Sequence, residues 1–302
     1  MGERTVPSHA GAAHGRALAY LDSPTLATWT GSSRARVALF RWYVRLFGYP
    51  ELAAQRRFRP VQEMLGRCGG RVVLDLGAGN GLYSIADAIR RPGSLHFLAD
   101  ISARHMHRAE ATGRALGLPV GAVVCSAEAL PLRSASVDAV LLIEVLQFVD
   151  DDVRVVEEVG RVLRSGGLWL CEQECASDEP PVNAGGSRNR PEPRLTKRRK
   201  GHSVERLCRL ASRAGLALQG SEVVSGRISR WWEGLEARIL GRSRTLHLVL
   251  FPMGRALAWL SALSPLERTP GTVLYVFRKN VVAPDPVSGP RGSALDTVST
   301  TG

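Results

Sequence analysis

Lysine, cysteine and long apolar runs are all scarce in this sequence. Its five cysteines form no Cys-x-x-Cys pair, so neither a disulfide framework nor a closed zinc site is indicated. The most apolar stretch, residues 246–263, is interrupted by Pro252, Gly254 and Arg255, whereas a membrane span needs about 20 predominantly apolar residues. The first sixteen residues contain no apolar core of a secretory signal, so we expect a cytoplasmic protein.

The net charge of +12 is unevenly distributed along the chain. Of 40 basic residues only three are lysines. A basic excess usually points to nucleic acid or an anionic membrane. Between residues 71 and 179, however, acidic residues outnumber arginines, so the positive charge lies in the flanks. With 44% hydrophobic and 23% charged residues, the composition is that of an ordinary globular protein, and the charge alone selects no partner.

Short apolar segments alternate with amphipathic ones through the middle of the chain. This alternation predicts a doubly wound, mostly parallel seven-stranded α/β sheet. The expected strands are residues 72–76, 95–99, 120–125, 137–143, 168–172, 216–224 and 273–278. Helices are expected at 35–47, 52–65, after the first strand to residue 89, 103–116, 153–163 and 203–214, the last with a serine cap.

The same pattern divides the chain into segments. We expect a disordered start (1–22), N-terminal helices (23–70), the α/β domain (71–282) and a disordered tail (283–302). Within the domain, 176–201 reads as a flexible basic insertion. Residues 227–264, rich in tryptophan, leucine and arginine, read as a helical insertion before the last strand that covers the acceptor as a lid.

A glycine-rich turn follows the first predicted strand. Gly77, Gly79 and Gly81 stand where the backbone must approach a ligand closely, and the next helix points its N-terminus at the same place. Asp100 closes the second strand, where a carboxylate can accept hydrogen bonds from both ribose hydroxyls of an adenosine cofactor. Dinucleotide enzymes space their glycines as G-x-G-x-x-G, so the G-x-G-x-G spacing favours a mononucleoside ligand.

Four segments together resemble the class I S-adenosylmethionine-dependent methyltransferases, in particular their small-molecule group. They are VVLDLGAGNG, LADISARHMHRA, CSAEALPLRSASVDAVLLIEVLQFVDD and RVLRSGGLWL. The resemblance covers residues 71–175 well and the region after residue 202 loosely. It implies S-adenosylmethionine as cofactor, a small-molecule acceptor and no metal.

The resemblance also implies roles for particular residues. Asp75 and the loop Gly77, Ala78, Gly79 and Gly81 would hold the amino-acid end of the cofactor. Asp100 would bind the ribose and Ile101 the adenine face, with Ser126, Ala127 and Glu128 at the adenine edge. Ile143, with Glu144 and Val145, would border the methionyl part and the acceptor, and Tyr83 either lines the pocket or packs in the core.

Methyl transfer from a sulfonium needs alignment above all, and a base only where the acceptor keeps its proton. Candidate catalytic bases are Glu144 and His202, with His247 further away. The aromatic insertion suggests a bulky apolar acceptor such as a natural product, a quinone-like molecule or a lipid. Its interleaved arginines suit peripheral contact with a membrane.

Two alternatives remain open from the residues. The basic flanks would suit an RNA methyltransferase, although the better-known nucleic-acid motifs are missing and nucleic acid is disfavoured as a partner. A non-catalytic protein of the cofactor fold is the other alternative, which the intact glycine turn and Asp100 disfavour. The oligomeric state is left open.

Overall fold

The computed structural model describes residues 34–47, 52–67, 69, 71–174, 203–225, 252–253, 256 and 272–281. The predicted flexible insertion, most of the predicted lid, both termini and His202 lie outside these residues. Among the described helices, none is both long enough and apolar enough to span a membrane.

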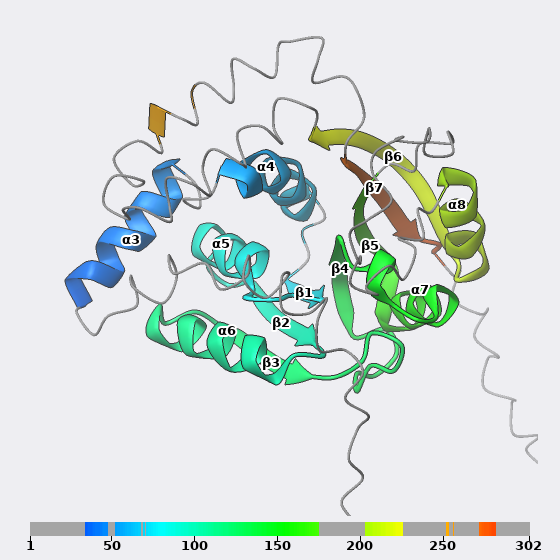
Figure 1. The fold of residues 1–302 in the computed structure, drawn as a ribbon, viewed down its shortest axis with the longest axis horizontal. Helices are drawn as coiled ribbons and strands as arrows, with labels where there is room; N and C mark the ends of the chain where they lie inside the picture. The colour runs from blue at the N-terminus through cyan, green and yellow to red at the C-terminus, as the bar shows by residue number, and fades with distance from the viewer. Residues whose placement is uncertain are drawn as a thin grey trace, which may run out of the picture.

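Seven strands form one sheet in the order β3-β2-β1-β4-β5-β7-β6 (Figure 1). They are β1 (Val72–Leu76), β2 (Leu95–Asp100), β3 (Val120–Val124), β4 (Val137–Ile143), β5 (Leu163–Glu174), β6 (Leu216–Ser225) and β7 (Thr272–Lys279). Strands β1 to β5 are parallel, and β7 runs antiparallel to both β5 and β6. This confirms the predicted mostly parallel α/β sheet, and β7 adds the antiparallel pairs.

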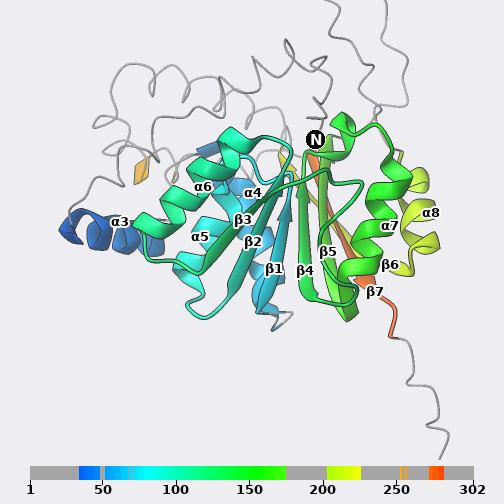
Figure 2. The same ribbon diagram turned by 90° about the horizontal axis from the view of Figure 1, so that it is seen from below.

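Helices flank both faces of the sheet, as Figures 1 and 2 show. The described helices are α3 (Arg34–Phe47), α4 (Leu52–Arg67), α5 (Leu82–Arg90), α6 (Ala103–Ala115), α7 (Asp152–Val162) and α8 (Val204–Arg213), with a 3-10 turn, η1 (Leu146–Phe148). The α-helices agree with the predicted ranges within two residues, whereas η1 was not predicted. Ser203 accepts a hydrogen bond from the Arg206 N–H at 3.3 Å, so the predicted cap of α8 is confirmed.

The core is divided between the two faces of the sheet. On one face, Val140, Leu142 and Trp169 pack with residues of α7 and α8. On the other, Leu141 and Leu170 pack with Val61 and Leu65 of α4. This two-sided burial explains why the central strands read as nearly continuous apolar runs.

Strand β5 is longer than predicted, because it begins at Leu163 rather than Leu168. The intervening residues Arg164 to Gly167 resemble a turn in sequence. Leu163 nevertheless pairs with Val137, and the register shifts before the regular pairing of Leu168 with Ala139. An irregular ladder of this kind leaves no period-two signal.

The strand order places a site at one edge of the sheet. Strands β1 and β4 are neighbours, but the chain leaves β1 toward β2 on one side and β4 toward β5 on the other. In open parallel sheets the crevice at such a reversal, beyond the carboxyl ends of the strands, is where ligands bind. The glycine turn, Asp100 and Ile143 all follow or close strands at this edge.

Candidate cofactor and acceptor site

The glycine turn after β1 is held tightly against the sheet. The N–H groups of Gly77 and Ala78 donate to the Ala99 carbonyl at 2.7 and 3.2 Å, which joins the turn to β2. Gly77, Gly79 and Gly81 have φ values of 73°, 54° and 72°, in the left-handed region that favours glycine. A Cβ on Gly77 would overlap the side chain of Val145, so the end of β4 closes over the turn from the other side.

Asp100 links the glycine turn to the end of β2. One carboxylate oxygen accepts from the Gly79 N–H at 2.9 Å and the other from the Ser102 N–H at 2.8 Å. A carboxylate has about four lone-pair positions, so two hydrogen bonds leave acceptor capacity. Ile101, next in the chain, is 70% exposed and presents an apolar surface beside that carboxylate.

Asp75 lies buried beneath the first turn of α5. The Ser84 hydroxyl donates to its carboxylate at 2.8 Å. Burial raises the pKa of Asp75 to about 6, with a smaller contribution from Asp100, while Ser84 and the His96 imidazole act in the opposite direction. With this pKa the carboxyl group is mostly ionised at pH 7 and mostly protonated at pH 5, and a cation bound nearby would favour its ionised form.

The end of β4 carries an unusual backbone conformation. Glu144 has φ of 57°, a left-handed value uncommon for a residue with a side chain. Its N–H donates to the Glu172 carbonyl at 2.8 Å, which fixes the end of β4 on β5. Such conformations cost about 1–3 kcal/mol and cluster at functional sites.

Family comparison agrees with this geometry. Residues 74–171 match the model of a methyltransferase domain. A ubiquinone biosynthesis O-methyltransferase of Paracidovorax citrulli is 32% identical over 128 residues, covering 38% of this chain and 52% of that protein. A ubiquinone/menaquinone biosynthesis C-methyltransferase of Acidiphilium cryptum is 36% identical over 105 residues, covering 33% and 41%.

A solved S-adenosylmethionine-dependent methyltransferase from Mesorhizobium loti shares the fold, with a TM-score of 0.50 and 21% identity over 76% of this chain and 100% of that one. The central part of this chain is a class I methyltransferase domain. The chain spans between about a third and a half of the length of the curated relatives it matches.

The residues of this methyltransferase domain fit S-adenosylmethionine, the cofactor of its class. Asp100 retains acceptor positions for ribose hydroxyls, and exposed Ile101 suits the adenine face. The left-handed glycines let the backbone approach a ligand. Asp75 and Glu144 add carboxylates at the same edge of the sheet. Their negative charge complements the sulfonium and ammonium groups of the cofactor.

The segment after β3, which is implied to lie at the adenine edge, also has structural contacts of its own. The Glu128 carboxylate accepts from the N–H groups of Asp150 and Asp151, at 3.1 and 3.0 Å, and so supports the approach to α7. Ser126 accepts from the Glu128 N–H at 3.2 Å, and Ala127 packs against the core. Their contact with adenine stays a prediction.

Two residues at the same edge were not singled out from the sequence. Glu172 is 1% exposed and lies beside Ile143 in the register of β4 with β5. Phe148, in η1, is 66% exposed. Glu172 could have been found from the sequence, because its carboxylate ends the apolar run LWLCE. Phe148 could not, because it lies in a turn that has no periodic pattern.

Tyr83 and Cys171 both pack within the core of the fold. Tyr83 stacks on Phe58 with ring centroids 4.5 Å apart, which connects α5 to α4. Cys171 is fully buried, and this burial raises the pKa of its thiol above the ordinary range. Since a thiolate is the reactive form, Cys171 is poorly suited to act as a nucleophile.

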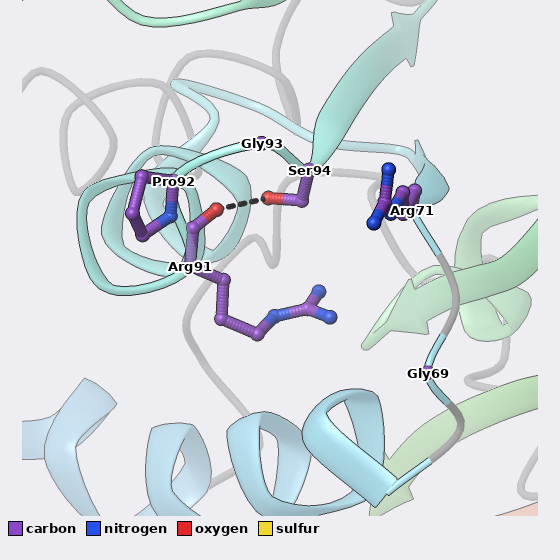
Figure 3. A pocket seen from close by; sticks show the side chains of 6 residues that line it. All are labelled: Gly69, Arg71, Arg91, Pro92, Gly93 and Ser94. Carbon is purple, nitrogen blue, oxygen red and sulfur yellow. Dashed lines mark hydrogen bonds between the residues drawn. The ribbon is translucent and has the colours of Figure 1, made fainter.

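A cavity of about 370 Å³ lies at the opposite edge of the sheet, where β1 and β2 begin (Figure 3). It is lined by Gly69, Arg71, Arg91, Pro92, Gly93 and Ser94. The Arg91 guanidinium is held by the Asp87 carboxylate and by the Leu65 carbonyl at 3.0 Å. Because this cavity lies at the amino ends of β1 and β2, it is separate from the glycine turn at their carboxyl ends and is not part of the cofactor site.

Proposed function

We propose that the protein transfers a methyl group from S-adenosylmethionine to a small, apolar acceptor. The observation that carries the proposal is the Asp100 carboxylate, which joins the glycine turn to β2 beside an exposed Ile101. In this proposal Asp100 binds the ribose, Ile101 packs on the adenine, and the turn with Asp75 holds the amino-acid end.

The acceptor is proposed to lie over the ends of β4 and β5. Half-buried Ile143 and exposed Phe148 offer apolar contacts there. The two ubiquinone-pathway relatives support a quinone-like acceptor among the classes considered, which also include natural products and lipids.

The chemistry asks the protein for alignment and, for some acceptors, for a base. Bound S-adenosylmethionine supplies a methyl group on a cationic sulfur. The acceptor atom forms a bond to that carbon as the carbon–sulfur bond breaks, and the sulfur leaves as a neutral thioether. Where the acceptor atom belongs to a hydroxyl group, the hydroxyl proton must also leave. Glu144 is the candidate base that lies among the residues described by the structure. His202, the other candidate, lies outside the described residues.

Methyl-labelled S-adenosylmethionine tests this proposal directly. We expect the purified chain, given a bacterial metabolite and lipid extract, to move label into the organic-soluble fraction, and to do so in the presence of EDTA. The Asp100→Ala variant serves as control and should move little label. Label recovered in added RNA instead would contradict the small-acceptor proposal and favour the RNA alternative.

The pH dependence of cofactor binding tests the place of Asp75. We expect the affinity for S-adenosylmethionine to fall about tenfold from pH 7 to pH 5, because a cation beside Asp75 favours its ionised form. Below a free-protein pKa of about 6, binding must expel a proton from this carboxyl group, and expulsion costs more as the pH falls.

Titration calorimetry at the two pH values measures this effect. The ligand's own amino group, with a pKa of about 8, stays protonated throughout. His96 and Asp100 also face Asp75, so the matched variant is Asp75→Asn, which keeps both neighbours and should bind equally at pH 7 and pH 5. A pH-independent affinity of the unaltered protein would show that the cation does not lie beside Asp75.

A further inference from the structure

The outer side of α3 carries an apolar stripe that the fold does not bury. Phe40 and Val44 face inward and are 1% and 0% exposed. Leu39, Trp42 and Leu46, at helical spacing on the opposite side, are each 54% exposed. One helix therefore presents apolar side chains both to the core and away from it.

Arginines border this stripe on both flanks. Arg34 follows one side and Arg36 the other, and both are exposed. The helix RARVALFRWYVRLF contains no acidic residue. Arg41 donates to the Leu116 carbonyl at 3.4 Å and Arg45 to the Ile89 carbonyl at 3.3 Å, which fixes the rotation of α3 on the domain. The stripe is thus held outward by the packing of the inner face.

We propose that the outer face of α3 binds an anionic membrane surface. A helix with leucine and tryptophan on one side and arginines beside them can lie in the interface, with apolar side chains among the acyl chains and guanidinium groups at the lipid phosphates. Tryptophan is enriched at this depth. At about 1.5 Å per residue the 14-residue helix offers a contact about 21 Å long.

Charge favours a lipid surface over a second copy of the chain. A two-fold contact places the same patch on both partners, so the arginines flanking the stripe would meet the arginines of the copy. An anionic headgroup layer neutralises the same charges. Each basic residue near the surface strengthens binding about fivefold, and salt weakens this attraction.

Binding of α3 to a membrane would also position the cofactor site, because α3 packs on the helix that follows the glycine turn. Its buried residues Phe40 and Val44 pack against Ile85 and Ile89 of α5, and α5 begins at the glycine turn. Docking through α3 would hold the cofactor site close to the lipid. The proposed surface does not depend on methyl transfer, and its test measures binding alone.

Vesicle sedimentation of the full chain tests the surface. We expect binding to vesicles of equal phosphatidylglycerol and phosphatidylcholine in low salt, weaker binding at physiological salt, and little binding to phosphatidylcholine alone. The variant Leu39→Gln/Trp42→Gln/Leu46→Gln should bind at least about tenfold more weakly. Arg34→Gln/Arg36→Gln should lose about 30-fold in low salt.

Matched controls separate this surface from other exposed apolar residues. Leu218→Gln/Val281→Gln removes apolar side chains at a distant part of the described fold and should bind as the unaltered protein does. Circular dichroism and cofactor titration check that each variant is folded. Unchanged vesicle binding by the triple variant would overturn the proposal. So would absence of binding in low salt, or a concentration-dependent dimer that the triple variant abolishes without any vesicle binding.

Discussion

Replacing Gly77 with alanine is expected to destabilise the domain by about 2–5 kcal/mol and to abolish measurable cofactor binding. The left-handed backbone contributes about 1–2 kcal/mol of this cost, because φ is 73° and alanine carries a Cβ. Overpacking contributes about 1–3 kcal/mol, because that Cβ would overlap the Val145 side chain. Relief of the overlap would move the turn away from β4 and disturb the cofactor-binding backbone.

Gly117→Ala provides the matched comparison. Its φ of 60° is similar, but a Cβ there would meet nothing within 4 Å. Urea unfolding should therefore show a loss of only about 1–2 kcal/mol, with cofactor affinity unchanged. Adding Val145→Ala to Gly77→Ala should restore part of the stability, because the smaller side chain removes the overlap. Equal losses at Gly77 and Gly117, or no recovery in the double variant, would show that the contact with Val145 is not what fixes the turn.

Local patterns predicted most of the fold because each element has its own periodic signal. The apolar strands, the amphipathic helices and the serine cap of α8 depend on neighbours in sequence. The antiparallel direction of β7 could not be predicted in this way, because a strand has the same pattern in either direction.

Prediction of the site followed the same division. The glycine turn and Asp100 could be found because each stands directly after a recognisable strand, and parallel strands end at one edge. The contact of Val145 with Gly77 and the bond of Glu144 to Glu172 depend on the lateral order of β1, β4 and β5. The structural role of Glu128 could not be predicted either. Its carboxylate, implied to lie at the adenine edge, accepts hydrogen bonds from the N–H groups of Asp150 and Asp151, which are 22 and 23 residues away in the sequence.

Replacing Asp100 with alanine is expected to weaken the affinity for S-adenosylmethionine by about 10- to 150-fold, the loss that corresponds to a hydrogen bond with a charged partner. Two effects contribute. The ribose hydroxyls lose their acceptor, and the N–H groups of Gly79 and Ser102 lose the carboxylate that holds the turn against β2. Asp100→Asn retains one acceptor oxygen and should show an intermediate loss.

Asp138→Ala is the control for the structural part of this effect. The Asp138 carboxylate also accepts two backbone N–H groups, from Arg71 and Val72 at 2.9 Å each, but at the opposite edge of the sheet. Its removal should lower the free energy of unfolding while leaving cofactor affinity unchanged. A 2′-deoxy analogue of the cofactor isolates the ribose contribution by calorimetry, because it should bind the unaltered protein more weakly yet lose less affinity in the Asp100→Ala variant. If the analogue and the cofactor lose affinity equally, Asp100 does not bind the 2′-hydroxyl of the ribose.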